Sequence, residues 1–86
     1  MVEYFHLYIK QECPFCVQAV ELLKEKNKTH VITTLDNAPE ILEEYKKQYN
    51  HTTVPIVVKY DNFAAKGALI GGYTDLEKYL GEALDD

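Results

Sequence analysis

The chain has 86 residues, 47% of them hydrophobic, and its 14 acidic residues outweigh nine lysines, with no arginine, to give a formal net charge of −5. This balance argues against a nucleic-acid surface, and no apolar run reaches the length of a membrane span. We therefore expect a single domain over residues 1–86, monomeric and cytoplasmic, whose partners are small molecules or other proteins.

The first third of the chain has the pattern of a strand, a helix and a second strand. Residues 2–9 are almost continuously apolar, which is typical of a central strand covered on both faces. Pro14 suits the first turn of a helix that runs to about Lys26. The apolar stripe of this helix comprises Val17, Ala19, Val20, Leu22 and Leu23. Residues 31–35 predict the second strand, and a right-handed crossover makes the two strands parallel.

A second helix is predicted in the middle of the chain. Asn37 followed three residues later by Glu40 resembles a capping box, and the helix is expected to end near Asn50. Its apolar positions recur every four residues, at Ile41, Tyr45 and Tyr49.

The segment after this helix predicts a hairpin. Pro55 precedes a strand over residues 56–60, residues 61–67 have the character of a loop, and residues 68–70 form a second short strand. The simplest assignment pairs these two strands.

A third helix is predicted at the end of the chain. Gly71 and Gly72 break the strand pattern, and residues 74–77 resemble a second capping box, with Thr74 as the cap. The positions expected to face inward are Leu76, Tyr79, Leu80, Ala83 and Leu84.

Cys13 and Cys16 are the only cysteines, and they lie where the first strand gives way to the first helix. Two sulfurs at this spacing on a helix are close to disulfide distance, but a four-residue loop would stabilise the fold by only about 2 kcal/mol. A redox pair is therefore the better interpretation. The helix start and Lys10 favour a thiolate at Cys13, which makes Cys13 the nucleophile and Cys16 the resolving thiol.

Half of a zinc site is the alternative interpretation of two such cysteines. Zinc needs four ligands, and His6, His30 and His51 lack the spacing to complete the set, so no metal site is predicted. These histidines are given no role, and Tyr49, Tyr60 and Tyr79 are expected to pack.

Three motifs resemble the glutaredoxin branch of the thioredoxin superfamily. Residues 10–16 are similar to the family's Lys-x-x-Cys-Pro-Tyr-Cys, residues 53–55 to its Thr-Val-Pro loop, and residues 71–75 to its glutathione-binding Gly-Gly turn. They follow in the family's order and approximate spacing. The resemblance implies an α/β, thioredoxin-like (glutaredoxin) fold, βαβ-α-ββα, with a four-stranded mixed sheet flanked by three helices.

The resemblance also implies the roles of the site residues. Cys13 and Cys16 would be the catalytic pair, and Pro55 would be a cis proline whose loop faces them. The glutathione-binding residues would be Lys10, Phe15, Thr53, Val54, Pro55, Gly72, Tyr73, Thr74 and Asp75. In this arrangement the Tyr73 and Thr74 backbone holds the γ-glutamyl carboxylate, Asp75 lies near the ammonium group, and Lys10 meets the glycine-end carboxylate.

The activity expected from this resemblance is glutathione-dependent thiol-disulfide oxidoreduction. Substrates would be protein disulfides and protein-glutathione mixed disulfides, with ribonucleotide reductase as one candidate by family analogy. Glutathione would be a co-substrate, and no cofactor would be tightly bound. One alternative is a thioredoxin-reductase-dependent redoxin, although those usually carry Cys-Gly-Pro-Cys after a tryptophan, which this chain lacks. The other is a non-enzymatic iron-sulfur carrier in which Cys13 and glutathione from two chains hold a cluster.

Four features depart from the family pattern. Phe15 replaces the more usual tyrosine, and Glu12 places a carboxylate beside Cys13, where it opposes a thiolate. Ile56 stands where glutamine or arginine is common, and without arginine no bidentate grip on a carboxylate is available. The loop over residues 61–67 is longer than in compact members.

Overall fold

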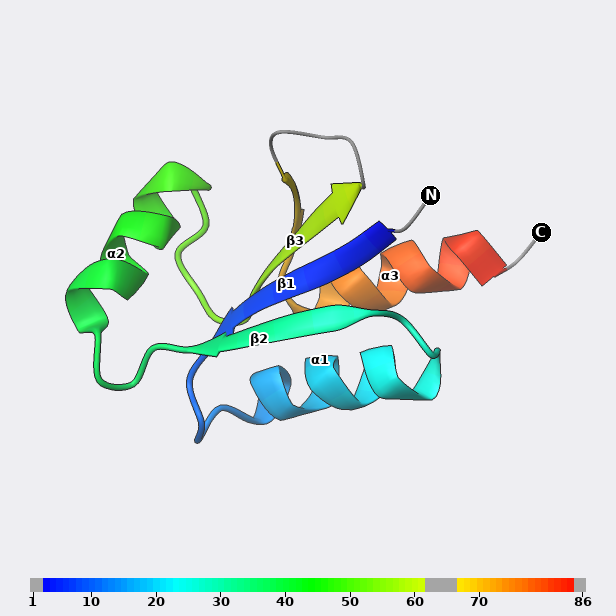
Figure 1. Cartoon of the computed structure of the whole chain (residues 1–86), viewed down its shortest axis with the longest axis horizontal. Helices are drawn as coiled ribbons and strands as arrows, with labels where there is room; N and C mark the ends of the chain where they lie inside the picture. Colours follow the sequence, from blue (N-terminus) through cyan, green and yellow to red (C-terminus); the bar gives the residue numbers. More distant parts are fainter. Residues whose placement is uncertain (1–2, 62–66, 85–86) are drawn as a thin grey trace.

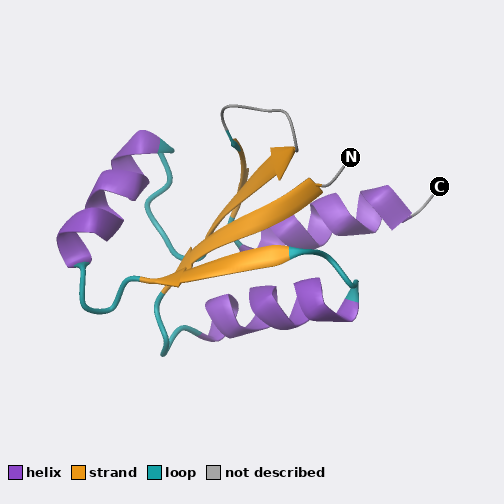
Figure 2. Cartoon of the chain, viewed as in Figure 1, coloured by secondary structure: helices purple, strands orange, loops and turns teal. Residues whose placement is uncertain are grey.

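The computed structural model describes residues 3–61 and 67–84. Its elements follow the predicted βαβ-α-ββα order (Figure 1, Figure 2). They are β1 (Glu3–Ile9), α1 (Pro14–Glu25), β2 (His30–Thr34), α2 (Pro39–Gln48), β3 (Ile56–Asp61), β4 (Ala68–Gly71) and α3 (Tyr73–Leu84). Val2 and residues 62–66 of the predicted long loop lie outside the described residues.

The strands form one mixed sheet in the order β2-β1-β3-β4. β1 pairs in parallel with β2 and antiparallel with β3, and β3 pairs antiparallel with β4. These pairings confirm the parallel first unit and the hairpin that the sequence predicts. β1 is central, and side chains alternate along it between the two faces, so that Phe5 and Leu7 enter one core and Tyr8 the other.

Helices cover both faces of the sheet. α1 and α3 pack on the face that carries Phe5 and Leu7, through buried leucines such as Leu23 and Leu76. α2 packs on the opposite face through Leu42, and Figure 1 shows it set apart from the other two helices. No helix in the described residues is long and apolar enough to cross a membrane.

The start of α2 differs from the prediction. Its N-cap is Ala38, which makes no side-chain capping bond, so a capping box at Asn37 is wrong. Pro39 occupies the first turn, where its fixed φ already suits a helix. The inward position is Leu42, whereas Ile41 is 51% exposed. Leu42 shares one helical face with Tyr45 because residues three apart are neighbours there.

The stripe predicted for α1 is also wider than the buried face. Ala19 and Leu23 are buried, and Val20 and Leu22 pack partly against the same core. Val17 is 48% exposed, because it lies on the side of the helix turned away from the sheet.

α3 begins earlier than the sequence predicts. The Leu76 N–H donates to the Gly72 carbonyl (3.0 Å), so Gly72 precedes the first turn and Thr74 does not cap the helix. Instead Asp75 reaches back, and its Oδ2 accepts from the Gly72 N–H (3.1 Å). Leu76 and Leu80 are buried as predicted, and the side chains of Ala83 and Leu84 lie outside the described part of the structure.

Candidate active site

Cys13 is the N-cap of α1. Its backbone is extended (φ −119°, ψ 111°), and its carbonyl accepts from the Val17 N–H at 3.0 Å. Its Sγ accepts a hydrogen bond from the Cys16 N–H at 3.3 Å. The sulfur therefore occupies the place where unpaired amides and the helix dipole favour negative charge.

The loop before β3 faces this sulfur. The Val54–Pro55 peptide bond is cis, as the resemblance implies. The Val54 carbonyl lies 3.9 Å from Cys13 Sγ, across 41 positions of sequence. The thiol at the helix start and the proline loop thus form one surface.

Cys16 lies one turn inside α1 and is completely buried, whereas Cys13 is half-buried; both are free thiols. Burial raises the pKa of the Cys16 thiol to about 12, and its hydrogen bond with Cys13 and the negative charges of Cys13 and Asp36 act in the same direction. A hydrogen bond with the backbone of Lys10 opposes these effects. Near neutral pH Cys16 is therefore a protonated thiol.

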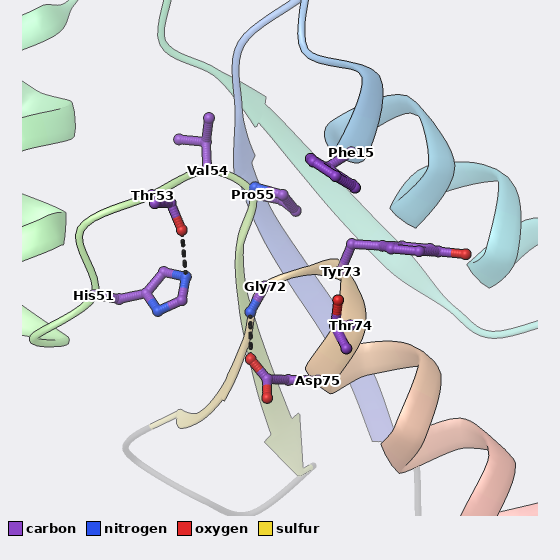
Figure 3. A pocket seen from close by; sticks show the side chains of 9 residues that line it. All are labelled: Phe15, His51, Thr53, Val54, Pro55, Gly72, Tyr73, Thr74 and Asp75. Atoms are coloured by element: carbon purple, nitrogen blue, oxygen red, sulfur yellow. Dashed lines mark hydrogen bonds between the residues drawn. The ribbon is translucent and has the colours of Figure 1, made fainter.

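A cavity of about 290 Å³ opens beside the proline loop (Figure 3). Three segments form it: the start of α1, the loop before β3 and the turn into α3. Its lining residues are Phe15, His51, Thr53, Val54, Pro55, Gly72, Tyr73, Thr74 and Asp75. Eight of the nine residues that the resemblance predicts for glutathione binding are thus brought together around one cavity.

The cavity has an aromatic side and a polar side (Figure 3). The rings of Phe15 and Tyr73 stack at 6.2 Å between centroids with an interplanar angle of 28°. Phe15 is 57% exposed, so this apolar surface is open to a ligand. On the other side, His51 Nε2 lies 3.4 Å from Thr53 Oγ1.

The turn into α3 forms one wall of the cavity (Figure 3). Gly71 has a φ of +126°, and a Cβ at this position would collide with the Asp75 carboxylate. Asp75 was predicted to meet a ligand ammonium, but one of its oxygens is already bonded to the Gly72 N–H. Its other oxygen makes no hydrogen bond within the described residues.

Lys10 does not join the other predicted residues. It follows β1, its side chain is exposed, and it does not line the cavity. In the described ranges 3–61 and 67–84 its ammonium forms no ion pair. The match of residues 10–16 to the family motif led to this prediction, and in the structure the chain turns at residues 11–12, between Lys10 and Cys13.

Two residues near the site were not predicted. Asp36 Oδ1 accepts from the Gln11 N–H (2.9 Å), which ties the segment before Cys13 to the end of β2. The parallel register that pairs Ile9 with Thr34 creates this contact, and no local pattern signals it. His51 lies two residues before the Thr-Val-Pro motif, and that nearness was the available signal.

Within the described part of the chain, no group of three or more histidine, cysteine or acidic side chains is arranged to hold a metal ion.

Comparisons with known proteins agree with the geometry. A family model described as glutaredoxin matches residues 5–63. A probable glutaredoxin of Acanthamoeba polyphaga mimivirus is 34% identical over 87 residues, covering 88% of this chain and 76% of the relative.

Two solved structures have the same fold. The dithiolic glutaredoxin of Trypanosoma brucei brucei superposes with a TM-score of 0.70 at 27% identity, covering 94% of this chain and 80% of that one. A glutaredoxin from Brucella melitensis superposes with a TM-score of 0.68 at 23% identity, covering 95% and 82%.

Proposed function

The chain belongs to the glutaredoxin family of thiol oxidoreductases, and we propose that it reduces protein disulfides and protein-glutathione mixed disulfides at the expense of glutathione. The observation that most supports this proposal is the position of Cys13. Its sulfur caps a helix and contacts the carbonyl of Val54, which lines a cavity together with seven other residues of the predicted glutathione-binding set. A thiol peptide in that cavity would bring its sulfur to the nucleophile.

In the first step, the Cys13 thiolate attacks one sulfur of the substrate disulfide. A new sulfur-sulfur bond forms between Cys13 and the substrate, and the second substrate sulfur leaves as a thiolate that takes a proton from water. Before the attack, the Cys16 N–H stabilises the negative charge on Cys13 Sγ. Electrons move from the chain to the substrate.

In the second step, Cys16 displaces the substrate from Cys13. Burial, the hydrogen bond with Cys13 and the charge of Cys13 raise the pKa of Cys16 in the reduced chain. The last two causes weaken once the Cys13 sulfur is in a mixed disulfide and no longer charged, so the pKa of Cys16 falls when its thiolate is needed, although burial still raises it. Cys16 loses its proton to solvent, bonds to Cys13, and releases the reduced substrate.

Two molecules of glutathione then restore the dithiol. The first attacks the internal disulfide at Cys13, giving a Cys13-glutathione mixed disulfide and a Cys16 thiol. The second attacks the glutathione sulfur and leaves as glutathione disulfide, which returns the electron pair to Cys13. The aromatic side of the cavity, formed by Phe15 and Tyr73, would hold the first glutathione during this exchange.

A coupled assay tests the proposal. NADPH oxidation is followed with a small disulfide or a glutathionylated peptide as substrate, once with glutathione and glutathione reductase and once with thioredoxin reductase alone. We expect turnover with the glutathione system only. Turnover with thioredoxin reductase alone would instead identify a thioredoxin-reductase-dependent redoxin. An absorbance band after anaerobic reconstitution with iron and sulfide would indicate an iron-sulfur cluster carrier.

A further inference from the structure

His51 lies on the polar side of the cavity and has no part in the steps above. Its Nε2 is 3.4 Å from Thr53 Oγ1 and would be 3.7 Å from a Cβ on Gly72. The imidazole therefore reaches from the loop before β3 toward the turn into α3, on the opposite side from Phe15 (Figure 3). A ligand between these walls would contact it.

The charges around the cavity make this position distinctive. Among the nine lining residues, His51 is the only basic side chain and Asp75 the only acidic one. Lys10 does not line the cavity, and the chain contains no arginine. The Tyr73 hydroxyl already donates a hydrogen bond to Glu77 Oε2 at 3.2 Å, so it is not free to donate to a ligand. Among the residues that the structure describes around this cavity, His51 is therefore the one basic side chain that a ligand carboxylate can meet.

We propose that His51 binds one of the two carboxylates of glutathione, with Nε2–H as the donor. This inference rests on the proposed function and names a contact within it. The imidazole is half-buried, so a hydrogen bond to a charged oxygen is less screened there than on an open surface. His51 would thereby supply the carboxylate contact that arginine would otherwise provide.

The test compares three thiols with four forms of the protein. The thiols are glutathione, its glycine-end amide, and an analogue whose γ-glutamyl α-carboxylate is replaced by hydrogen. The proteins are the wild type, His51→Ala, His51→Lys, and the control His30→Ala. His30 is a half-buried histidine on β2, outside the cavity, with Nδ1 2.8 Å from the Lys28 carbonyl.

We expect His51→Ala to lower kcat/KM for glutathione about three- to tenfold, which is less than the loss of a fully buried hydrogen bond to a charged group because solvent screens this half-buried contact. The loss should disappear with the one analogue that lacks the carboxylate bound by His51, which also identifies that carboxylate. His51→Lys should recover most of the wild-type value. His30→Ala should leave the glutathione constant unchanged, and circular dichroism should show all variants folded.

Two results would overturn the inference. An unchanged constant in His51→Ala would show that the imidazole does not contact glutathione. An equal loss with all three thiols would show that it shapes the cavity without binding a carboxylate. If wild-type protein, with Cys13 shown to be alkylatable, makes no use of glutathione, the proposed function fails and this inference fails with it.

Discussion

Cys13 and Cys16 are separated by one helical turn but lie in opposite environments. Cys13 caps α1, is half-buried, and contacts the proline loop that bounds the cavity. Cys16 is completely buried, and its pKa is raised to about 12. The comparison shows that one helical turn separates an accessible sulfur at a helix start from a buried thiol that is protonated near neutral pH, which is the contrast that the proposed division of roles requires.

Replacing each cysteine by serine should break this comparison most strongly. Cys13→Ser should abolish both deglutathionylation and disulfide reduction, because both begin with attack by that sulfur. Cys16→Ser should keep most deglutathionylation, where a second glutathione releases Cys13, yet lower disulfide reduction by at least about a hundredfold, because an intramolecular thiol acts at high effective concentration. Both activities are measured in the coupled assay. Equal loss of the two in a folded Cys16→Ser protein would refute the division of roles.

Alkylation should expose the same difference in the reduced wild type. With a pKa of about 12, only on the order of one Cys16 in 10⁵ is ionised at pH 7, and the side chain is fully buried. Iodoacetamide should therefore label Cys13 at least about tenfold faster, as read by mass spectrometry. Because a raised acid pKa keeps Cys16 neutral, its labelling should increase only as pH rises toward 12. Faster labelling of Cys16 near neutral pH would reverse the assignment.

A single charge tests one cause of the contrast. Asp36→Asn removes a negative charge that raises the pKa of Cys16 and keeps an oxygen for the Gln11 N–H. The pKa of Cys16 should fall, and Cys16 labelling in alkaline solution should rise less than about fivefold, because Asp36 is exposed and screened. Asp36→Ala is the matched comparison, since it also removes the hydrogen bond. If charge is the cause, both variants should show the same gain over the wild type, and the gain should shrink in 1 M salt. A gain in Asp36→Ala alone, or a gain as large in 1 M salt as in low salt, would show that charge is not the cause.

The smallest effect is expected at Cys13, from the loss of a neighbouring charge. Glu12 is exposed and immediately precedes Cys13. Glu12→Gln should raise the rate of Cys13 alkylation less than about twofold, because the thiolate loses a screened like charge. The gain should shrink as salt is added. An unchanged rate at low ionic strength would show that the carboxylate points away from the sulfur.

The sequence carried most of the fold because its signals are local. The strand, helix and strand patterns of the first 35 residues predict a parallel unit, and the capping pattern over residues 74–77 predicts the last helix. The cap of α3 was predicted wrongly because two neighbouring side chains can form a hydrogen bond at the start of that helix. Thr74 and Asp75 can both bond the start of α3, and the position at which Gly71 turns the chain decides for Asp75.

The parts of the site that could not be predicted depend on contacts distant in sequence. Asp36 meets Gln11 only through the register of β1 and β2. His51 enters the cavity because the loop before β3 folds beside the turn at Gly72. Lys10 shows the opposite case, since it is close to Cys13 in sequence but does not line the cavity.

The hydrogen bond from the Cys16 N–H to Cys13 Sγ links the sulfur's chemistry to the stability of the helix it caps. A thiolate is a stronger acceptor than a disulfide sulfur, so we expect this hydrogen bond to hold the first turn of α1 most strongly in the reduced protein. In the internal disulfide, the covalent bond between Cys13 and Cys16 would tie the same turn instead. Exchange of the Cys16 amide with solvent deuterium should therefore be fastest while Cys13 is in a mixed disulfide, where neither constraint is at full strength.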